Sequence, residues 1–280
     1  MNAMLLLVFG LGYTGREIAR QAAAQGATVV ATSRTPDRLT PPEGVGLIPF
    51  EDAAEVLGRA THVLQTAAPT EDGDPVLRFY AGRLGAPGWA GMLSTTGVYG
   101  DRGGGWVDED TVPAPTGPRG ERRLDAERDW AAAFPAARVD LFRLAGIYGP
   151  GRSVLDDVRA GTARRVDKPD HQFGRIHRDD IAAAVLAAMA QDRAPGSRVL
   201  NLADDEPAAN AAVVAEAARL LGAPMPPLVP LEEALAAMSP MGRSFWAENR
   251  KVASAKTKER LGIAWRFPTF REGLAAILAG

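Results

Sequence analysis

Three glycines near the start of the chain have the spacing of a phosphate-binding turn. Gly10, Gly12 and Gly15 form the pattern G-x-G-x-x-G, directly after the apolar run 5–9 and before a helix-like stretch at 16–25. In this context the first glycine permits a tight turn, the second lets a pyrophosphate approach, and the third allows close packing of helix on strand. Amides at the start of the helix then face the phosphates. The predicted contacts with a dinucleotide are Gly10, Gly12, Tyr13, Thr14 and Gly15.

The residues after the second predicted strand, 27–32, indicate which dinucleotide binds. An Asp or Glu at this place would bond to the ribose 2′-hydroxyl of NAD. The sequence instead has Ser33 and Arg34, with Arg38 one helical turn further on. An arginine pairs well with a 2′-phosphate, and a serine hydroxyl can donate to it. The alternative is that Arg34 is an ordinary solvated residue. We expect NADP(H) rather than NAD(H).

Further contacts with the cofactor are expected where two later strands end. The predicted strand 62–65 is followed by Thr66, Ala67 and Ala68, and the predicted strand 138–142 leads to Leu144. The carboxyl ends of parallel strands meet at one edge of a sheet, where ligands bind in such folds.

Short apolar runs alternate with alanine-rich amphipathic stretches along most of the chain. This alternation is typical of a parallel sheet with helices on both faces. We therefore predict an α/β fold, a Rossmann-type doubly wound parallel sheet with a small C-terminal substrate lobe. The predicted strands are 5–9, 27–32, 46–49, 62–65, 91–94, 138–142 and 198–202, and the predicted helices are 16–25, 75–84, 120–133 and 180–191.

The pattern changes after Gly149, Pro150 and Gly151, and a proline-rich connector follows at 224–230. We expect residues 1–150 to form the NADP-binding core and residues 151–280 to form mainly the substrate-binding lobe. A strand near 198–203 is expected to return to the core sheet.

The composition excludes several classes of protein. Of 280 residues, 46% are hydrophobic and 24% are charged, as in ordinary globular proteins. The formal net charge of −2 gives no general attraction to nucleic acid or to an anionic membrane. Without cysteine and with three histidines, no metal site is expected. The apolar segment from Met4 to Leu11 is interpreted as a buried strand rather than a signal peptide, and no stretch suits a membrane span. We expect a cytoplasmic protein.

Several segments of the chain together resemble one family. Together with the glycine turn, six segments resemble the extended short-chain dehydrogenase/reductases, the NAD-dependent epimerase/dehydratase family. The segments follow the family's order and span nearly the whole chain. The resemblance implies a nicotinamide-dependent oxidoreductase or epimerase that acts on a small molecule. Family members often form homodimers, and this option stays open for the chain. The segments are STTGVYG (94–100), RLAGIYGPG (143–151), IHRDDIA (176–182), VLNL (199–202), KERLG (258–262) and FREGL (270–274).

The family's acid/base pair, Tyr-x-x-x-Lys, is missing from this chain. The best register places Arg119 at the tyrosine position and Arg123 at the lysine position. Arginine does not release its proton near neutral pH, so it cannot replace the tyrosine as an acid. In this respect the chain resembles the atypical subgroup of the family, in which the active-site residues are poorly kept.

Two interpretations of Arg119 and Arg123 stay open. Residues four apart on a helix face the same way, so their charges repel unless an anion, such as a phosphate of the substrate or cofactor, binds between them. Alternatively, they belong to a solvated helix face, because most residues in 119–129 are charged. Arg119 is therefore a candidate for substrate binding. Arg123 is a candidate for gripping the nicotinamide ribose, as the family's lysine does.

The resemblance also implies where catalysis would take place. It places the family's hydroxyl residue at Thr95, which would hydrogen-bond the reacting carbonyl or hydroxyl. Tyr99 and Tyr148 follow predicted strands and are candidates for the proton donor, and the alternative for each is a packing role with a satisfied hydroxyl. Arg175 stands near the place where nucleotide-sugar enzymes of the family carry a pyrophosphate-binding arginine. These enzymes often have an Asn at the position of Gly146.

Two functions follow from these patterns. The first is an NADP(H)-dependent oxidoreductase or epimerase-like enzyme that acts on a nucleotide sugar or another small carbonyl or hydroxyl compound. The alternative is a non-catalytic NADP(H)-sensing protein that regulates or binds a partner. The missing tyrosine and lysine are the main argument for the alternative.

Overall fold

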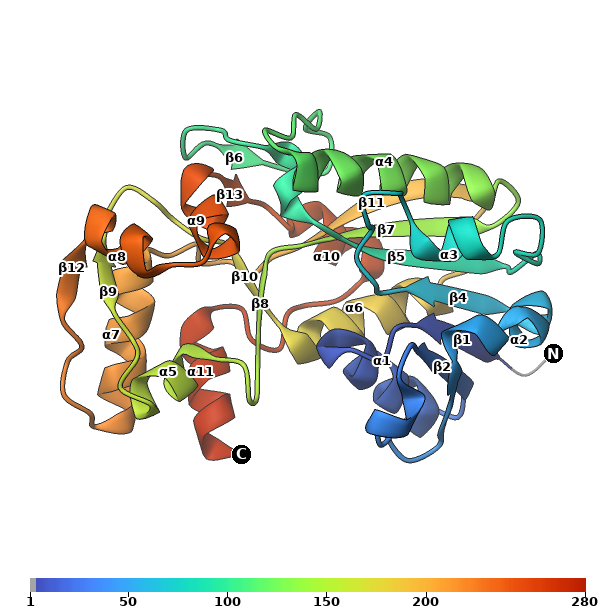
Figure 1. Ribbon diagram of the computed structural model, residues 1–280, viewed down its shortest axis with the longest axis horizontal. Helices are drawn as coiled ribbons and strands as arrows, with labels where there is room; N and C mark the ends of the chain where they lie inside the picture. The colour runs from blue at the N-terminus through green and yellow to red at the C-terminus, as the bar shows by residue number, and fades with distance from the viewer. Residues whose placement is uncertain (1–3) are drawn as a thin grey trace.

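The computed structural model describes residues 4–280 of the chain. Its centre is a seven-stranded sheet in the order β11-β7-β5-β4-β1-β2-β3 (Figure 1). All neighbouring strands in this sheet are parallel. The predicted doubly wound parallel sheet is therefore confirmed. The strands are β1 (Leu5–Phe9), β2 (Thr28–Ser33), β3 (Val45–Pro49), β4 (His62–Gln65), β5 (Trp89–Thr95), β7 (Arg138–Leu144) and β11 (Gly196–Leu202).

Helices cover both faces of the sheet because its strands are apolar on both sides. Successive side chains of a strand point to opposite faces. Leu6 and Val8 of β1 belong to the core that includes Ile18, whereas Leu7 belongs to the core that includes Trp130. The helices of the first face are α1 (Tyr13–Ala24), α6 (Arg178–Ala190) and α10 (Ala255–Leu261), and those of the second face are α2 (Ala54–Arg59), α3 (Pro75–Phe79) and α4 (Pro118–Ala133).

Helix boundaries differ from the predicted ones at two places. Helix α1 begins at Tyr13, three residues earlier than expected, because the glycine turn leads directly into it. Helix α3 ends at Phe79 rather than at residue 84. Gly82 lies beyond it with φ of +74°, a left-handed backbone that cannot continue a helix. Between residues 4 and 280, none of the helices combines the length and the apolar composition needed to cross a bilayer.

The order of the strands creates a crevice at one edge of the sheet. From β1 the chain builds outward to β2 and β3, and then returns to add β4, β5, β7 and β11 on the other side. Between β1 and β4 the connecting helices therefore leave toward opposite faces of the sheet. In such sheets, ligands bind outside the carboxyl ends of the strands at this point.

The later part of the chain contributes both to the sheet and to a smaller lobe. β11, the strand expected to return, pairs with β7, and α6 and α10 pack on the core. The other later elements lie beside the crevice, on the left of Figure 1. They are β8 (Gly146–Tyr148) with β10 (Arg175–His177), β9 (Arg165–Asp167) with β12 (Leu228–Pro230), β13 (Lys251–Val252) with β6 (Trp106–Val107), and helices α5 (Val154–Arg159), α7 (Asn210–Leu221), α8 (Leu231–Ala237), α9 (Pro240–Ala247) and α11 (Phe270–Ala279).

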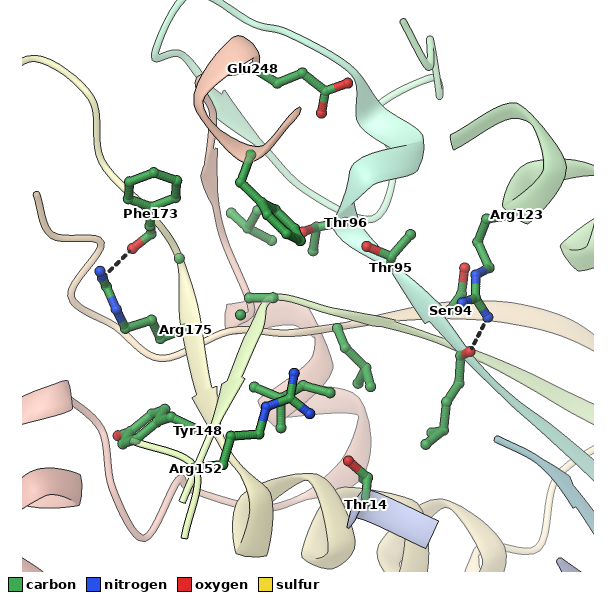
Figure 2. Close-up of a pocket in the computed structure, with 18 of the residues that line it drawn as sticks. Thr14, Ser94, Thr95, Thr96, Arg123, Tyr148, Arg152, Phe173, Arg175 and Glu248 are labelled. Atoms are coloured by element: carbon green, nitrogen blue, oxygen red, sulfur yellow. Dashed lines mark hydrogen bonds between the residues drawn. The ribbon is translucent and has the colours of Figure 1, made fainter. Parts of the chain in front are cut away.

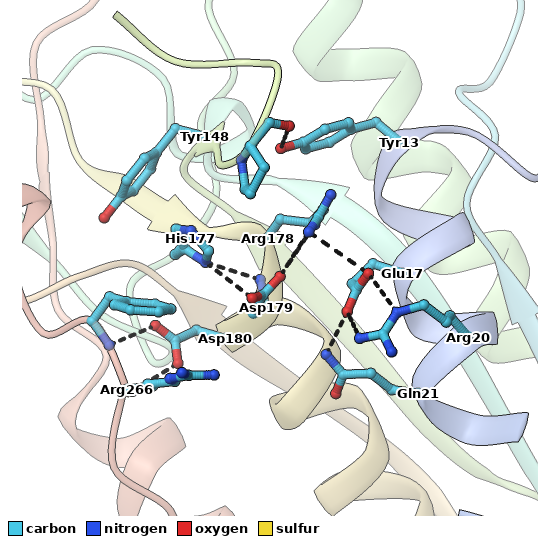
Figure 3. Close-up of polar contacts among 12 residues, drawn as sticks. Tyr13, Glu17, Arg20, Gln21, Tyr148, His177, Arg178, Asp179, Asp180 and Arg266 are labelled. Atoms are coloured by element: carbon cyan, nitrogen blue, oxygen red, sulfur yellow. Dashed lines mark hydrogen bonds and ion pairs between the residues drawn. The ribbon is translucent and has the colours of Figure 1, made fainter. Parts of the chain in front are cut away.

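A buried carboxylate fixes α1 against α6 (Figure 3). Glu17 accepts hydrogen bonds from Arg20 and Gln21, and its carboxylate lies 3.7 Å from the guanidinium of Arg178. Burial raises the pKa of Glu17, but these hydrogen bonds and the Arg178 charge outweigh it and lower the pKa below its usual value. Arg178 also pairs with Asp179 at 3.1 Å. This cluster holds the helix that follows the glycine turn.

Candidate cofactor and substrate site

A cavity of about 840 Å³ lies at the carboxyl edge of the sheet. Its lower wall is the glycine turn with the start of α1, and its back wall is formed by the ends of β5 and β7 (Figure 2). Side chains from the loop before α9, from α9 itself and from the strand β13 close the opposite side. The cavity therefore lies between the core sheet and the smaller lobe.

The three glycines of the turn differ in what surrounds them. Gly10 has φ of +98°, and a Cβ there would lie 2.8 Å from Oγ1 of Thr66. A Cβ on Gly15 would overlap the carbonyl oxygen of Gly10, so only glycine lets α1 approach β1 this closely. A Cβ on Gly12 would meet no atom within 4 Å. Gly12 thus faces open space in which a ligand can approach the backbone.

The start of α1 presents unsatisfied amides to the cavity. The first N–H groups of any helix have no partner within it, and here the first turn has no acidic side chain to bond them. Tyr13 and Thr14 both line the cavity at this point. The Thr66 hydroxyl lies 2.8 Å from the carbonyl of Gly10 and donates to the turn, and Ala67 and Ala68 follow in the same loop. The geometry suits a phosphate group.

The end of β2 carries no carboxylate. The Ser33 hydroxyl accepts a hydrogen bond from the amide of Thr35 at 3.0 Å, which leaves its proton free to donate. Arg34 and Arg38 are exposed and have no carboxylate within 4.0 Å in residues 4–280. These three side chains lie outside the cavity wall, at the surface beyond the glycine turn.

Three consecutive hydroxyl residues lie at the end of β5 and the start of the 3-10 turn that follows it. The Ser94 hydroxyl donates to Glu127 and is not available to a ligand. The Thr95 hydroxyl accepts from the amide of Gly97 at 3.1 Å, so its own proton stays free. Figure 2 shows this hydroxyl directed into the cavity, with Thr96 beside it. Thr95 is the hydroxyl best placed to bond a reacting oxygen.

Arg123 and Arg119 project from α4 into the same cavity. Arg123 donates to the carbonyl of Leu93 at 2.9 Å. Burial, followed by repulsion from Arg119, lowers the pKa of Arg123 to about 10. The guanidinium of Arg119 lies 5.1 Å from the centre of the Phe245 ring on α9. The structure therefore places both arginines in the wall of the cavity that also holds the end of β5.

Two of the other arginines at the cavity differ in their partners. Arg175 is half-buried, and its Nη1 donates to the carbonyls of Phe173 and Ala208, at 2.8 and 3.1 Å. One end of its guanidinium thus holds the backbone. The guanidinium of Arg152, which also lines the cavity, lies 5.6 Å from the centre of the Tyr13 ring at the start of α1. Arg152 was not predicted as a site residue, although it directly follows the Gly-Pro-Gly loop after a strand.

Tyr99 lies away from the cavity, in a buried polar network. Its hydroxyl donates to Asn201 at 2.8 Å, and its ring lies under the guanidinium of Arg143, 4.8 Å away. Arg143 in turn forms a buried ion pair with Glu127 at 2.8 Å. Burial raises the pKa of Tyr99 above its usual value. The sequence analysis did not identify this network, because its members are far apart in the chain.

Tyr148 lines the cavity with its ring, but its hydroxyl points away from it (Figure 2). The hydroxyl lies 3.5 Å from the carbonyl of Thr269, and a Cβ on Gly273 would overlap it. Burial, with the nearby carboxylate of Asp204, raises the pKa of Tyr148 strongly. The structure therefore does not bring Tyr148, Tyr99 and Thr95 together around one point. Leu144, at the end of β7, does line the cavity.

No known protein-family model matches the chain. Protein YeeZ of Escherichia coli is 28% identical over 131 residues, which are 47% of this chain and 45% of YeeZ. The chain therefore aligns with less than half of the length of YeeZ. The 3-diazoavenalumate denitrifying reductase of a Streptomyces species is 26% identical over an alignment that covers 97% of this chain and 99% of that protein.

Solved structures show the same fold. Human epimerase family protein SDR39U1, solved with NADPH, has a TM-score of 0.78 at 20% identity and covers 99% of this chain and 100% of that one. UDP-N-acetylglucosamine 4-epimerase from Bacillus cereus has a TM-score of 0.74 at 16% identity, with 98% of each chain covered. A conserved protein of unknown function from Silicibacter pomeroyi is 41% identical and has a TM-score of 0.86. The match covers 99% of this chain and 99% of that protein. The chain thus belongs to the same family as the Silicibacter pomeroyi protein, and its fold is that of the NAD-dependent epimerases and dehydratases, the extended short-chain dehydrogenase/reductases.

Proposed function

We propose that this protein is an NADP(H)-dependent oxidoreductase that acts on a small carbonyl or hydroxyl compound. The proposal rests on the glycine turn, which lines a cavity of about 840 Å³. This cavity lies at the crevice where the connecting helices between β1 and β4 leave toward opposite faces of the sheet. The space at Gly12 and the amides of α1 fit a pyrophosphate. The human relative in fold was solved with NADPH, and the Streptomyces relative is named a reductase.

The preference for the 2′-phosphate rests on the surface next to β2. Arg34 and Arg38 are exposed cations there, and the Ser33 hydroxyl has a free proton. A phosphate dianion accepts hydrogen bonds from such groups, whereas a ribose hydroxyl gains little from a cation. NADPH should therefore bind more tightly than NADH.

When bound, the cofactor supplies or accepts a hydride. Thr95 donates its free proton in a hydrogen bond to the reacting oxygen of the substrate. The guanidinium groups of Arg123 and Arg119 line the same cavity and make the surroundings of the substrate positively charged. In the direction of reduction the substrate oxygen, hydrogen-bonded to Thr95, would take its proton from water. Because the Tyr99 and Tyr148 hydroxyls point elsewhere, the proposal assigns no tyrosine as acid.

A binding titration tests the cofactor. Trp246 lines the cavity, so tryptophan fluorescence can follow the addition of NADPH, NADP+, NADH and NAD+. We expect NADPH and NADP+, which carry the 2′-phosphate, to bind at least about tenfold more tightly than NADH and NAD+. Arg34→Ala should remove this difference, while Arg59→Ala, an exposed arginine of α2 paired with Glu55, should keep it. Equal affinity for all four would contradict the NADP preference, and no binding of any would contradict the proposed function.

An NADP(H) sensor without catalysis is the second candidate. It is favoured by one observation, that no tyrosine hydroxyl of the described residues faces the Thr95 end of the cavity. An enzyme consumes NADPH when a suitable carbonyl compound is added, which a fall in NADPH absorbance detects. A sensor binds oxidised and reduced cofactor with different affinities and consumes neither.

A further inference from the structure

We propose that the ligand of the substrate half of the cavity carries an oxyanion, a carboxylate or a phosphate, which binds between Arg119 and Arg123 of α4. This inference rests on the proposed function and names its substrate class. It gives the two arginines one shared role, in place of the separate roles of substrate and ribose binding.

Arg123 is a half-buried cation that has no counter-ion among residues 4–280. Its recorded hydrogen bond goes to the carbonyl of Leu93, and no carboxylate of residues 4–280 lies within 4.0 Å of it. The carboxylates of Glu127 and Asp74 are close enough for their charges to raise the pKa of Arg123. Both carboxylates, however, are bonded to other groups. Glu127 pairs with Arg143 at 2.8 Å. Most of the N–H groups of Arg123 are therefore free for a ligand.

Asp74 is occupied just as fully as Glu127. It caps α3 by accepting from the amides of Val76 and Leu77, and its second oxygen accepts from Gln65 at 2.8 Å. Neither carboxylate can turn to Arg123 without leaving its own buried partners unsatisfied. Neither of these two carboxylates is therefore free to serve as the counter-ion of Arg123.

Arg119 adds a second cation at the same place. It stands one helical turn before Arg123, and its exposed guanidinium lies 5.1 Å from the centre of the Phe245 ring of α9. Two like charges in this arrangement destabilise each other. An anion between them reverses the sign of that interaction, and a guanidinium pairs with both oxygens of a carboxylate or phosphate. The neutral hydroxyls of a ribose cannot do this.

The start of α4 brings the two arginines close to Thr95. A Cβ on Gly120 would lie 3.1 Å from the carbonyl of Gly97, so α4 contacts the 3-10 turn Thr96–Tyr99 that follows Thr95. An oxyanion on the pair therefore lies next to the hydroxyl that bonds the reacting oxygen. This places the anionic group of the substrate near its reacting carbon.

The charges around the rest of the cavity favour the same conclusion. Its wall holds five arginines and a single glutamate, Glu248, which pairs with Arg250 at 2.5 Å. Arg175 is bonded to backbone carbonyls, and Arg152 lies beside the start of α1, where the cofactor phosphates would bind. Arg119 and Arg123 are the two of these arginines that stand on the helix in contact with the turn after Thr95.

The test uses the protein saturated with NADP+, so that the cofactor site is filled. Inorganic phosphate, pyruvate and uncharged methyl pyruvate are titrated separately, followed by the fluorescence of the cavity tryptophan and by the melting temperature. We expect saturable binding of at least one of the two anions and none of the ester. Binding of inorganic phosphate would identify the ligand group as a phosphate, and binding of pyruvate would identify it as a carboxylate. No saturable binding of either anion to the NADP+-bound protein overturns the inference and leaves the proposed function standing.

Variants separate the anion site from a ribose site. Arg123→Met and Arg119→Met should each weaken anion binding by at least about tenfold and leave NADP+ affinity unchanged. Arg122→Met is the matched control, since Arg122 stands on the same helix but pairs with Glu71 outside the cavity. The melting temperatures of the ligand-free variants control for folding. Weaker NADP+ binding by Arg123→Met with unchanged anion binding would assign Arg123 to the ribose and overturn the inference.

Discussion

At the scale of single residues, the proposed chemistry depends on the hydroxyl of Thr95. Its oxygen is held by the amide of Gly97, so its proton has a defined direction into the cavity. We predict that Thr95→Val lowers kcat by about a hundredfold, the usual loss when one preorganised donor is removed. The affinity for NADPH should not change, because this side chain contacts the substrate. Steady-state kinetics and the cofactor titration measure the two quantities, and unchanged turnover would remove Thr95 from the mechanism.

The glycine turn was easier to predict from the sequence than the rest of the cavity wall. Gly10, Gly12 and Gly15 are close together in the chain, and their roles follow from one local turn. The place of Arg152 depends on long-range folding, since the Tyr13 hydroxyl bonds to the carbonyl of Pro150, 137 residues later. Spacing along the chain carries no signal for such a contact.

The two tyrosines illustrate the same limit. From sequence, Tyr99 and Tyr148 both follow strands and both qualify as proton donors. Only the fold shows that one hydroxyl bonds to Asn201 and that the other points toward α11. Arg119 and Arg123 were identified by the register of the family motif, but their lack of counter-ions is visible only in three dimensions.

At the scale of elements, the β1–α1 turn separates packing from binding. We predict that Gly15→Ala lowers the stability of the fold, because its Cβ overlaps the Gly10 carbonyl. Gly12→Ala should leave stability nearly unchanged, since its φ of −78° suits alanine and no atom lies within 4 Å of the new Cβ. It should nevertheless weaken NADPH binding by at least about tenfold, because the methyl group occupies the space of the pyrophosphate. Urea unfolding and the cofactor titration measure both variants, and equal loss of stability in both would contradict this division of roles.

The segment that supports α9 depends on a buried histidine. His171 stacks on Trp246 with 5.4 Å between ring centres, and its Nε2 lies 2.9 Å from the carbonyl of Glu248. Burial, followed by the charge of Lys168, lowers the pKa of His171 to about 4. Between its unfolded value of about 6.5 and this value, the unfolded chain binds the extra proton more readily, so stability falls as the pH falls.

We predict that the substitution His171→Gln removes this part of the pH dependence. The difference in unfolding free energy between wild type and variant should be constant above about pH 6.5 and should shrink as the pH falls toward 4. Urea unfolding of both proteins across this range measures the difference. The same slope in both proteins would show that His171 titrates equally in the folded and unfolded states.

The core elements were predictable because their pattern is local and repeated. Apolar strands alternate with amphipathic helices, and all seven strands of the sheet were expected near their observed positions. The small lobe was not predictable in the same detail. Its strands β8, β9, β10 and β12 have three residues each, which is too short for a period of two to be recognised. Two of these strands, β8 and β10, nevertheless line the cavity, and for this reason that part of its wall could not be predicted from the sequence.

At the scale of the whole molecule, the cavity belongs to neither part of the chain alone. The glycine turn, β5 and α4 form one side, and the segment from Met238 to Val252 forms the other. This segment is tied to the core after α9, where the carbonyl of Asn249 accepts from the amides of Arg102 and Gly104. Helix α9 itself meets the core through Arg119 and the half-exposed ring of Phe245. A ligand held by Arg119 would therefore fix α9 in place.

We predict that amide hydrogen exchange in α9 slows most when NADP+ and a small oxyanion are both bound. NADP+ alone contacts the core side, so it should slow exchange in the β1–α1 turn and have a smaller effect on α9. The anion immobilises Arg119, which stacks on Phe245, and thereby raises the free energy of local opening of the helix. Arg119→Met should lose the additional protection in α9 and keep that of the turn, whereas the buried strands β1 and β5 should not change in either protein. Equal protection of α9 by NADP+ alone would mean that the cofactor, rather than the anion, connects the two sides of the cavity.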